Sequence, residues 1–188
     1  MALYEYPGYG QSHGHPSEES FYQALKAVSQ DLVDRGVPTT DQIAVGWSIG
    51  GAVTLGVASD PAFAGFKGAV LMNTFTSMPN VIRHMFARGW DDIAWAKIQG
   101  RLQTRFESVN HIENIHCPVA IVSAEEDKRF PQTLRFSDTL FEAANQAIHR
   151  WRTSVPEADH SDITTSAYVD ALNAAIAQVI TASAGTKA

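Results

Sequence analysis

The residues best suited to chemistry lie in one glycine-flanked segment, Gly46-Trp47-Ser48-Ile49-Gly50. An apolar run, Ile43-Ala44-Val45, precedes this segment, and a second one, Gly51-Ala52-Val53-Thr54-Leu55, follows it. This order predicts a strand that turns abruptly into a helix, with Ser48 in strained backbone angles and a glycine two residues away on each side to avoid collision. An exposed hydroxyl at the positive end of a helix suits a nucleophile in acyl transfer. Without partners, the pentapeptide favours a glycine-serine turn that carries no chemistry.

An attacking serine needs a base to take its proton, and the base needs a carboxylate to orient it. His160 is the candidate base, on a loop after a short apolar run. The candidate acids are Glu125, Glu126 and Asp127, which follow another apolar run. The order nucleophile, acid, histidine, each after a successive strand, would bring the three groups to the carboxyl edge of a parallel sheet.

Simpler interpretations of several polar residues stay open. His160 also suits a surface loop, and Asp159 or Asp162 could cap the helix that follows. His13 and His15 suggest a metal by their proximity, but no cysteine or carboxylate cluster at ligand spacing accompanies them, which favours a solvated loop.

Length, hydrophobic content, net charge and cysteine count indicate what class of protein this is. The chain has 188 residues, is 45% hydrophobic and carries a formal net charge of −6, which predicts one domain with its own core and a small neutral or cationic ligand rather than nucleic acid or a membrane. The only cysteine, Cys117, precedes Pro118 and an apolar run, so we expect a buried structural thiol. The start of the chain has neither a basic leader nor a long apolar stretch, and we expect a cytoplasmic protein.

Strand and helix patterns alternate along the chain and predict an α/β fold with a mostly parallel sheet flanked by helices. A helix is expected from about Ser17 to Gly36, and a last one carries Tyr168, Leu172, Ile176 and Val179 on one stripe. Five short runs predict buried strands that are apolar on both faces: Leu3 to Tyr6, Gln42 to Gly46, Gly68 to Asn73, Val119 to Ser123, and Arg150 to Ser154.

One insertion interrupts this alternation. Between Asn73 and Val119 the chain is longer than a single crossover helix needs, so we expect a small helical cap over about residues 76–112 within a single domain of residues 1–188. The cap contains several large apolar side chains: Met78, Met85, Phe86, Trp90 and Trp95. Beside the expected mouth of the site, Trp47, Tyr9 and Phe75 are candidates for contact with an acyl group.

The sequence resembles α/β-hydrolases of the Bem46 type, which are also grouped with serine aminopeptidase-like hydrolases. Besides the Ser48, Asp127 and His160 positions, the resemblance rests on four segments: Tyr6-Pro7-Gly8-Tyr9-Gly10-Gln11-Ser12, Asn73-Thr74-Phe75-Thr76-Ser77-Met78, Arg105-Phe106-Glu107-Ser108 and Ile115-His116-Cys117-Pro118. It implies a hydrolase of small ester, thioester or amide bonds. In it Ser48 is the nucleophile, Asp127 rather than its glutamate neighbours is the acid, His160 is the base, and neither a metal nor an organic cofactor takes part.

The chain departs from the family pattern at its start, where three earlier strands and a loop that donates one oxyanion amide are expected to be missing. The backbone N–H of Ile49 is then the expected remaining donor. Without the intervening strand, either Leu3 to Tyr6 slides beside the nucleophile strand or a second copy covers the open edge in a homodimer. Two alternatives to the esterase-like hydrolase stay open: an impaired hydrolase that acts as a binding protein, and an aminopeptidase-like activity.

Overall fold

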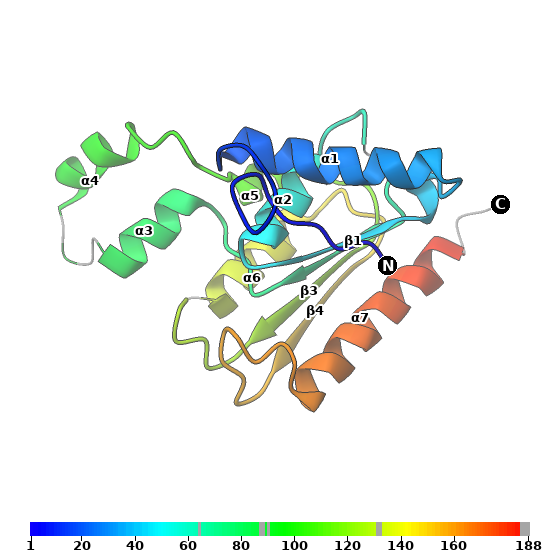
Figure 1. Ribbon diagram of the computed structural model, residues 1–188. Coiled ribbons are helices and arrows are strands. Elements are labelled where there is room, and N and C mark those ends of the chain that lie inside the picture. The colour runs from blue at the N-terminus through cyan, green and yellow to red at the C-terminus, as the bar shows by residue number, and fades with distance from the viewer. Residues whose placement is uncertain (64, 87–88, 90, 131–132, 185–188) are drawn as a thin grey trace.

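A parallel sheet of four strands forms the centre of the protein (Figure 1). The computed structural model describes residues 1–63, 65–86, 89, 91–130 and 133–184. Within them the strands follow the order β1-β2-β3-β4 and each pairs in parallel with the next. Their bounds are Ile43–Trp47 for β1, Gly68–Met72 for β2, Val119–Ala124 for β3 and Arg150–Val155 for β4.

Helices cover both faces of this sheet (Figure 1). The helices α2 (Ile49–Ala58), α5 (Ser108–Ile112) and α6 (Thr133–Ala143) line one face, and α1 (Glu18–Asp34) packs on α2. On the opposite face, α7 (Ser166–Ala184) lies against β2, β3 and β4. A short 3-10 helix, Thr39–Asp41, leads into β1. This arrangement confirms the expected α/β class.

Two further helices, α3 (Met78–Phe86) and α4 (Asp92–Gln99), extend away from the sheet in Figure 1. With α5 they occupy the range for which a cap was expected. Within α4, Trp95 is buried, whereas Phe86 at the end of α3 is exposed. Trp90 lies outside the described residues, and the cap bounds of about 76–112 stay a prediction.

Four of the five expected strands form, and the first does not. Residues Leu3 to Tyr6 belong to the blue N-terminal loop of Figure 1, and among the described residues β1 pairs with β2 alone. The Tyr6 ring instead stacks on Phe21 of α1 at 4.2 Å between centroids, and the chain then turns through a Tyr9 N–H to Tyr6 O bond of 2.9 Å. The predicted strand at Leu3 to Tyr6 is therefore wrong, and so is its predicted slide beside β1, because tyrosine packing on α1 holds this segment rather than strand pairing.

Burial of the strands also differs from the expectation of apolar strands throughout. The central strands β2 and β3 are buried at every position, as a parallel sheet covered on both faces requires. In β4, however, only Val155 is buried and Arg150 and Arg152 are exposed, because β4 is an edge strand with one neighbour.

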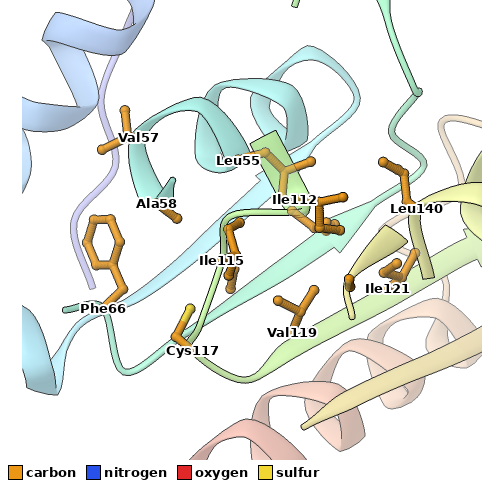
Figure 2. Packing of buried hydrophobic residues seen from close by; sticks show 13 residues of the cluster. Leu55, Val57, Ala58, Phe66, Ile112, Ile115, Cys117, Val119, Ile121 and Leu140 are labelled. Atoms are coloured by element: carbon orange, nitrogen blue, oxygen red, sulfur yellow. The ribbon is translucent and has the colours of Figure 1, made fainter. Parts of the chain in front are cut away.

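The main core lies between the sheet and helices α2, α5 and α6. Figure 2 shows how side chains from β3 and from these helices point toward one another, among them Leu55, Ile112, Ile121 and Leu140. A second apolar cluster joins β2 and β3 to α7. A third, aromatic cluster lies beside the carboxyl ends of the strands and contains Phe21, Phe75, Phe106, Phe130 and Phe136.

We predict that Cys117 resists thiol reagents in the folded protein. Its side chain belongs to the main core (Figure 2), and burial raises the pKa of the thiol to about 11, so little thiolate forms at neutral pH. Titration with a chromogenic disulfide at pH 8 should give slow labelling in buffer and rapid labelling of one thiol in denaturant. Equally rapid labelling in both conditions would contradict this packing.

We predict that the chain self-associates through β1. One side of this strand has no partner within the described residues, and its apolar side chains Val45 and Trp47 are 47% and 40% exposed. An apolar edge strand without a charged residue is an open template for another strand. Light scattering should give more than the mass of one chain, and Val45→Lys should lower the value because a charged edge opposes pairing. A folded wild-type protein with the mass of one chain would contradict the prediction.

Candidate active site

Ser48 occupies the sharp turn between β1 and α2. Its backbone has φ 54° and ψ −118°, a left-handed conformation that a residue with a Cβ rarely adopts. Neighbouring loops hold the turn in place: the Ser48 N–H donates to Met72 O at 2.8 Å, and Thr74 Oγ1 donates to Ser48 O at 2.9 Å. The expected strained turn from strand to helix is therefore present.

The glycines around Ser48 play different parts. A Cβ on Gly46 would collide with the backbone of Gly50 and Gly51, so this position requires glycine. At Gly50 an added Cβ would meet only Tyr6 Oη, at an ordinary 3.6 Å. The second crowded glycine is Gly51, where a Cβ would lie 2.6 Å from Thr74 Cβ. The expectation of a glycine requirement two residues on each side is thus right at Gly46 and wrong at Gly50. On the α2 side the crowded position is Gly51, which packs against Thr74 of the loop after β2.

Three side chains from three loops meet next to this turn. His160 Nε2 lies 3.1 Å from Ser48 Oγ, and His160 Nδ1 lies 2.6 Å from Asp127 Oδ2. His160 is 3% exposed and Asp127 4% exposed. The geometry is that of a hydroxyl, an imidazole and a carboxylate in a hydrogen-bonded row.

The structure distinguishes among the three candidate carboxylates. Glu125 and Glu126 are exposed, and Glu125 Oε1 accepts a bond of 2.6 Å from Ser154 Oγ of β4. Asp127 alone of the three is buried and bonded to the imidazole. Its second oxygen, Oδ1, accepts the Phe130 N–H at 2.5 Å, so the carboxylate is held at both ends.

Aromatic rings enclose the imidazole. The Phe130 ring meets His160 edge to face at 4.7 Å, and the Trp47 ring lies 5.4 Å away on a tilt of 40°. In addition, Trp47 Nε1 donates to His160 O at 3.1 Å. These contacts fix both the ring and the backbone of His160.

Asp159 joins the loops that carry the acid and the histidine. Its Oδ1 accepts the backbone N–H of Lys128 at 2.8 Å and that of His160 at 2.7 Å, and these two hydrogen bonds lower the pKa of the Asp159 carboxyl. Asp162 Oδ2 in turn accepts the Asp159 N–H at 2.8 Å. Both carboxylates therefore bond within the loops before α7, rather than to the first turn of that helix.

The remaining predicted residues lie in different surroundings. Ile49 is the first residue of α2, where a backbone N–H has no partner within its own helix, and its amide stays the predicted oxyanion donor beside Ser48. Trp47 borders the imidazole and is partly exposed, and Tyr9 is 55% exposed with its ring 6.1 Å from Phe21. Phe75 is only 1% exposed and packs in the aromatic cluster. Contact of these three aromatic side chains with an acyl group stays a prediction.

The structure brings one further residue into the site, Asn73, for which no role was predicted. Its fully buried side chain bonds to the carbonyl of His160 and to the backbone at the end of β3. Asparagine directly after a strand is among the few residues that tolerate a left-handed backbone, but this local signal predicts a turn and not the distant partners.

The described residues contain neither a metal-binding cluster nor a helix that could span a membrane. Across the described ranges, no group of three or more His, Cys, Asp or Glu side chains could hold a metal ion. In the same part of the chain, none of the helices has the length and apolar character needed to cross a membrane.

The sequence profile of the prolyl oligopeptidase family matches residues 11–178. The chain belongs to this family. Protein bem46 of Schizosaccharomyces pombe is 27% identical over 164 residues, which are 85% of this chain and 51% of that protein. This agrees with the resemblance to α/β-hydrolases of the Bem46 type. The chain spans about half the length of the curated relatives it matches.

Solved structures confirm the α/β-hydrolase fold. An alpha-beta hydrolase from Vibrio vulnificus superposes with a TM-score of 0.68 at 20% identity, over 94% of this chain and 61% of that one. A monoacylglycerol lipase from Paleococcus ferrophilus gives a TM-score of 0.64 at 17% identity, over 95% and 82% of the two chains. The sheet of the described residues has four strands where five were expected. The α/β-hydrolase fold class itself is confirmed.

Proposed function

We propose that this protein is a serine hydrolase that cleaves small ester, thioester or amide bonds through an acyl intermediate on Ser48. In this proposal His160 is the base and Asp127 orients it. Membership of the prolyl oligopeptidase family and the likeness to a lipase fold support the class of reaction.

The observation that carries the proposal is the row of two hydrogen bonds. The 3.1 Å from Ser48 Oγ to His160 Nε2 lies within reach for proton transfer, and the 2.6 Å from His160 Nδ1 to Asp127 is a short bond to a carboxylate. With Nδ1 donating its proton to Asp127, the Nε2 lone pair faces the serine hydroxyl. The imidazole then has the tautomer that a base requires.

The reaction follows from these positions. His160 Nε2 takes the proton of Ser48 while Oγ forms a bond to the substrate carbonyl carbon, whose oxygen becomes negative. The protonated imidazole gives that proton to the leaving oxygen, sulfur or nitrogen as its bond to the carbon breaks. His160 Nε2 then takes a proton from water as the water oxygen forms a bond to the acyl carbon. The bond from that carbon to Ser48 Oγ breaks, and the imidazole returns the proton to Oγ, which releases the acid and restores the serine.

The negative oxygen needs hydrogen-bond donors. We assign one to the Ile49 N–H, at the positive end of α2 and adjacent to Ser48. Loss of one donor from such a site costs about 3 kcal/mol, or roughly a hundred- to a thousandfold in turnover, so a second donor controls how fast this chain can work.

We propose acyl substrates of short or medium length, because the Trp47 ring borders the His160 imidazole and the predicted cap, with helices α3 and α4, carries large apolar residues. The proposed chemistry requires neither metal nor organic cofactor, and its partner is a small molecule rather than nucleic acid or a membrane. We expect the protein to work in the cytoplasm.

We predict that a fluorophosphonate reagent labels Ser48 much faster than other serines. The reagent reacts quickly only with an activated hydroxyl, so wild type should label within minutes and Ser48→Ala should not. Labelling is followed by fluorescence in gels. Equal labelling of wild type and Ser48→Ala would contradict the proposal and favour a binding protein built on an inactive hydrolase fold.

We predict that Asp127→Asn lowers kcat on a nitrophenyl ester by on the order of 10⁴-fold, because the amide favours the wrong imidazole tautomer. The matched control is Glu125→Gln, a neighbouring carboxylate bonded to Ser154 instead of the histidine, and it should keep kcat within about twofold. The reverse ranking of the two variants would show that another carboxylate acts.

Comparison of nitrophenyl esters with amino-acid anilides separates an esterase from an aminopeptidase-like enzyme.

A further inference from the structure

We propose that Asn73 is a positioning residue that holds the backbone of His160 at the distance from Ser48 that proton transfer needs. This inference rests on the proposed function. Asn73 directly follows β2, which lies between the strand before Ser48 and the strand before Asp127. It is therefore central among the loops that carry the reacting groups.

The amide of Asn73 joins three separate segments. Its Nδ2 donates to His160 O at 3.0 Å, and its Oδ1 accepts the Ala124 N–H at 2.8 Å and the Tyr168 hydroxyl at 2.9 Å. One side chain thus connects the histidine loop, the end of β3 and helix α7. Each contact matches donor to acceptor, which fixes the orientation of the amide.

The carbonyl of His160 has a second donor. Trp47 Nε1 reaches the same oxygen at 3.1 Å from the last residue of β1. Two donors from adjacent strands therefore hold the backbone of the residue whose ring faces Ser48. With the backbone fixed, the Asp127 bond and the Phe130 ring determine the remaining rotation of the imidazole.

The position itself selects asparagine. The backbone of Asn73 has φ 45°, and its N–H donates to Val122 O at 3.0 Å, so the residue is locked against β3 in a left-handed conformation. Asparagine and aspartate tolerate this conformation, but aspartate lacks the N–H donor. Because Asn73 is 0% exposed, water cannot replace a lost partner.

The test substitution is Asn73→Asp, which keeps the size, the left-handed preference and the acceptor oxygen and removes the donor to His160. We expect kcat to fall by about 10- to 100-fold with KM within about twofold, since a shift near 1 Å in a reacting group has effects of that order. Turnover of a nitrophenyl ester is measured from pH 6 to 10.

The matched control is Gln42→Glu, the same amide-to-carboxyl change in a second buried network. Gln42 is 7% exposed, its Nε2 donates to Ser29 O at 3.1 Å and Val37 O at 2.9 Å, and its Oε1 accepts from Ser29 Oγ at 2.8 Å. It lies before β1, at the end of that strand away from Ser48. Gln42→Glu should lower the melting temperature as Asn73→Asp does and leave kcat within about twofold of wild type.

Three results would overturn the inference. A folded Asn73→Asp with wild-type kcat would do so, and so would equal kcat losses in Asn73→Asp and Gln42→Glu. Full recovery of Asn73→Asp at high pH would also do so. The loss would then come from the new carboxylate charge, which favours a protonated imidazole that cannot act as a base, and not from geometry. If Asn73→Asp does not fold, Tyr168→Phe decides: it removes the hydroxyl that orients the Asn73 amide, a severalfold lower kcat with an unchanged KM supports the inference, and an unchanged kcat overturns it.

A readout without turnover separates this inference from the proposed function. The imidazole N–H resonance of His160 in NMR spectra should shift or broaden in Asn73→Asp and stay as in wild type in Gln42→Glu. A wild-type protein that hydrolyses no ester, thioester or amide would refute the function, while the resonance would still report whether Asn73 holds the histidine. An unchanged resonance in a folded Asn73→Asp would overturn the positioning role alone.

Discussion

The site depends on one buried hydrogen bond, between Asp127 and His160. A carboxylate that leaves water loses several kcal/mol of solvation unless it gains hydrogen bonds in exchange. Asp127 regains them from the His160 imidazole at 2.6 Å and from the Phe130 N–H at 2.5 Å. If the loops after β3 and β4 separated, the Asp127 carboxylate would lose its hydrogen bond to the imidazole while still buried, or would have to move into water. This constraint holds the imidazole beside Ser48.

The parallel sheet explains why residues so far apart in sequence meet. Successive strands of such a sheet end at one edge, and the loops after β1, β2, β3 and β4 carry Ser48, Asn73, Asp127 and His160 respectively. The backbone of each loop is tied to its neighbour, as when Ser48 N–H donates to Met72 O of β2. Strain at Ser48 and Asn73, both with positive φ, is therefore maintained by the sheet rather than by the loops alone.

Much of this arrangement could be predicted from the sequence because its signals are local. Glycines and apolar runs locate the turn at Ser48, and the order of polar loops after strands indicates which groups converge. The strand expected at Leu3 to Tyr6 could not be judged in this way, since a strand forms only where another strand pairs with it. In this segment Tyr6 stacks on Phe21 instead of pairing with β1. Likewise, exposure of β4 follows from its place at the edge, which no single run of residues encodes.

The role of Asn73 lay beyond sequence reasoning for a related reason. Its partners, His160, Ala124 and Tyr168, are 87, 51 and 95 residues away along the chain, so no spacing rule connects them. The crowding at Gly51 also comes from a distant loop, through Thr74. Local pattern thus identifies the reacting groups, and long-range contacts determine how firmly they are held.

The most direct test of the central claim is peptide mapping by mass spectrometry after rapid acid quenching of a nitrophenyl ester reaction. The account predicts an acyl group on the peptide that contains Ser48, and none on that peptide in His160→Ala, which has lost the base. An acyl group on any other residue, or equal acylation of Ser48 without His160, would contradict it.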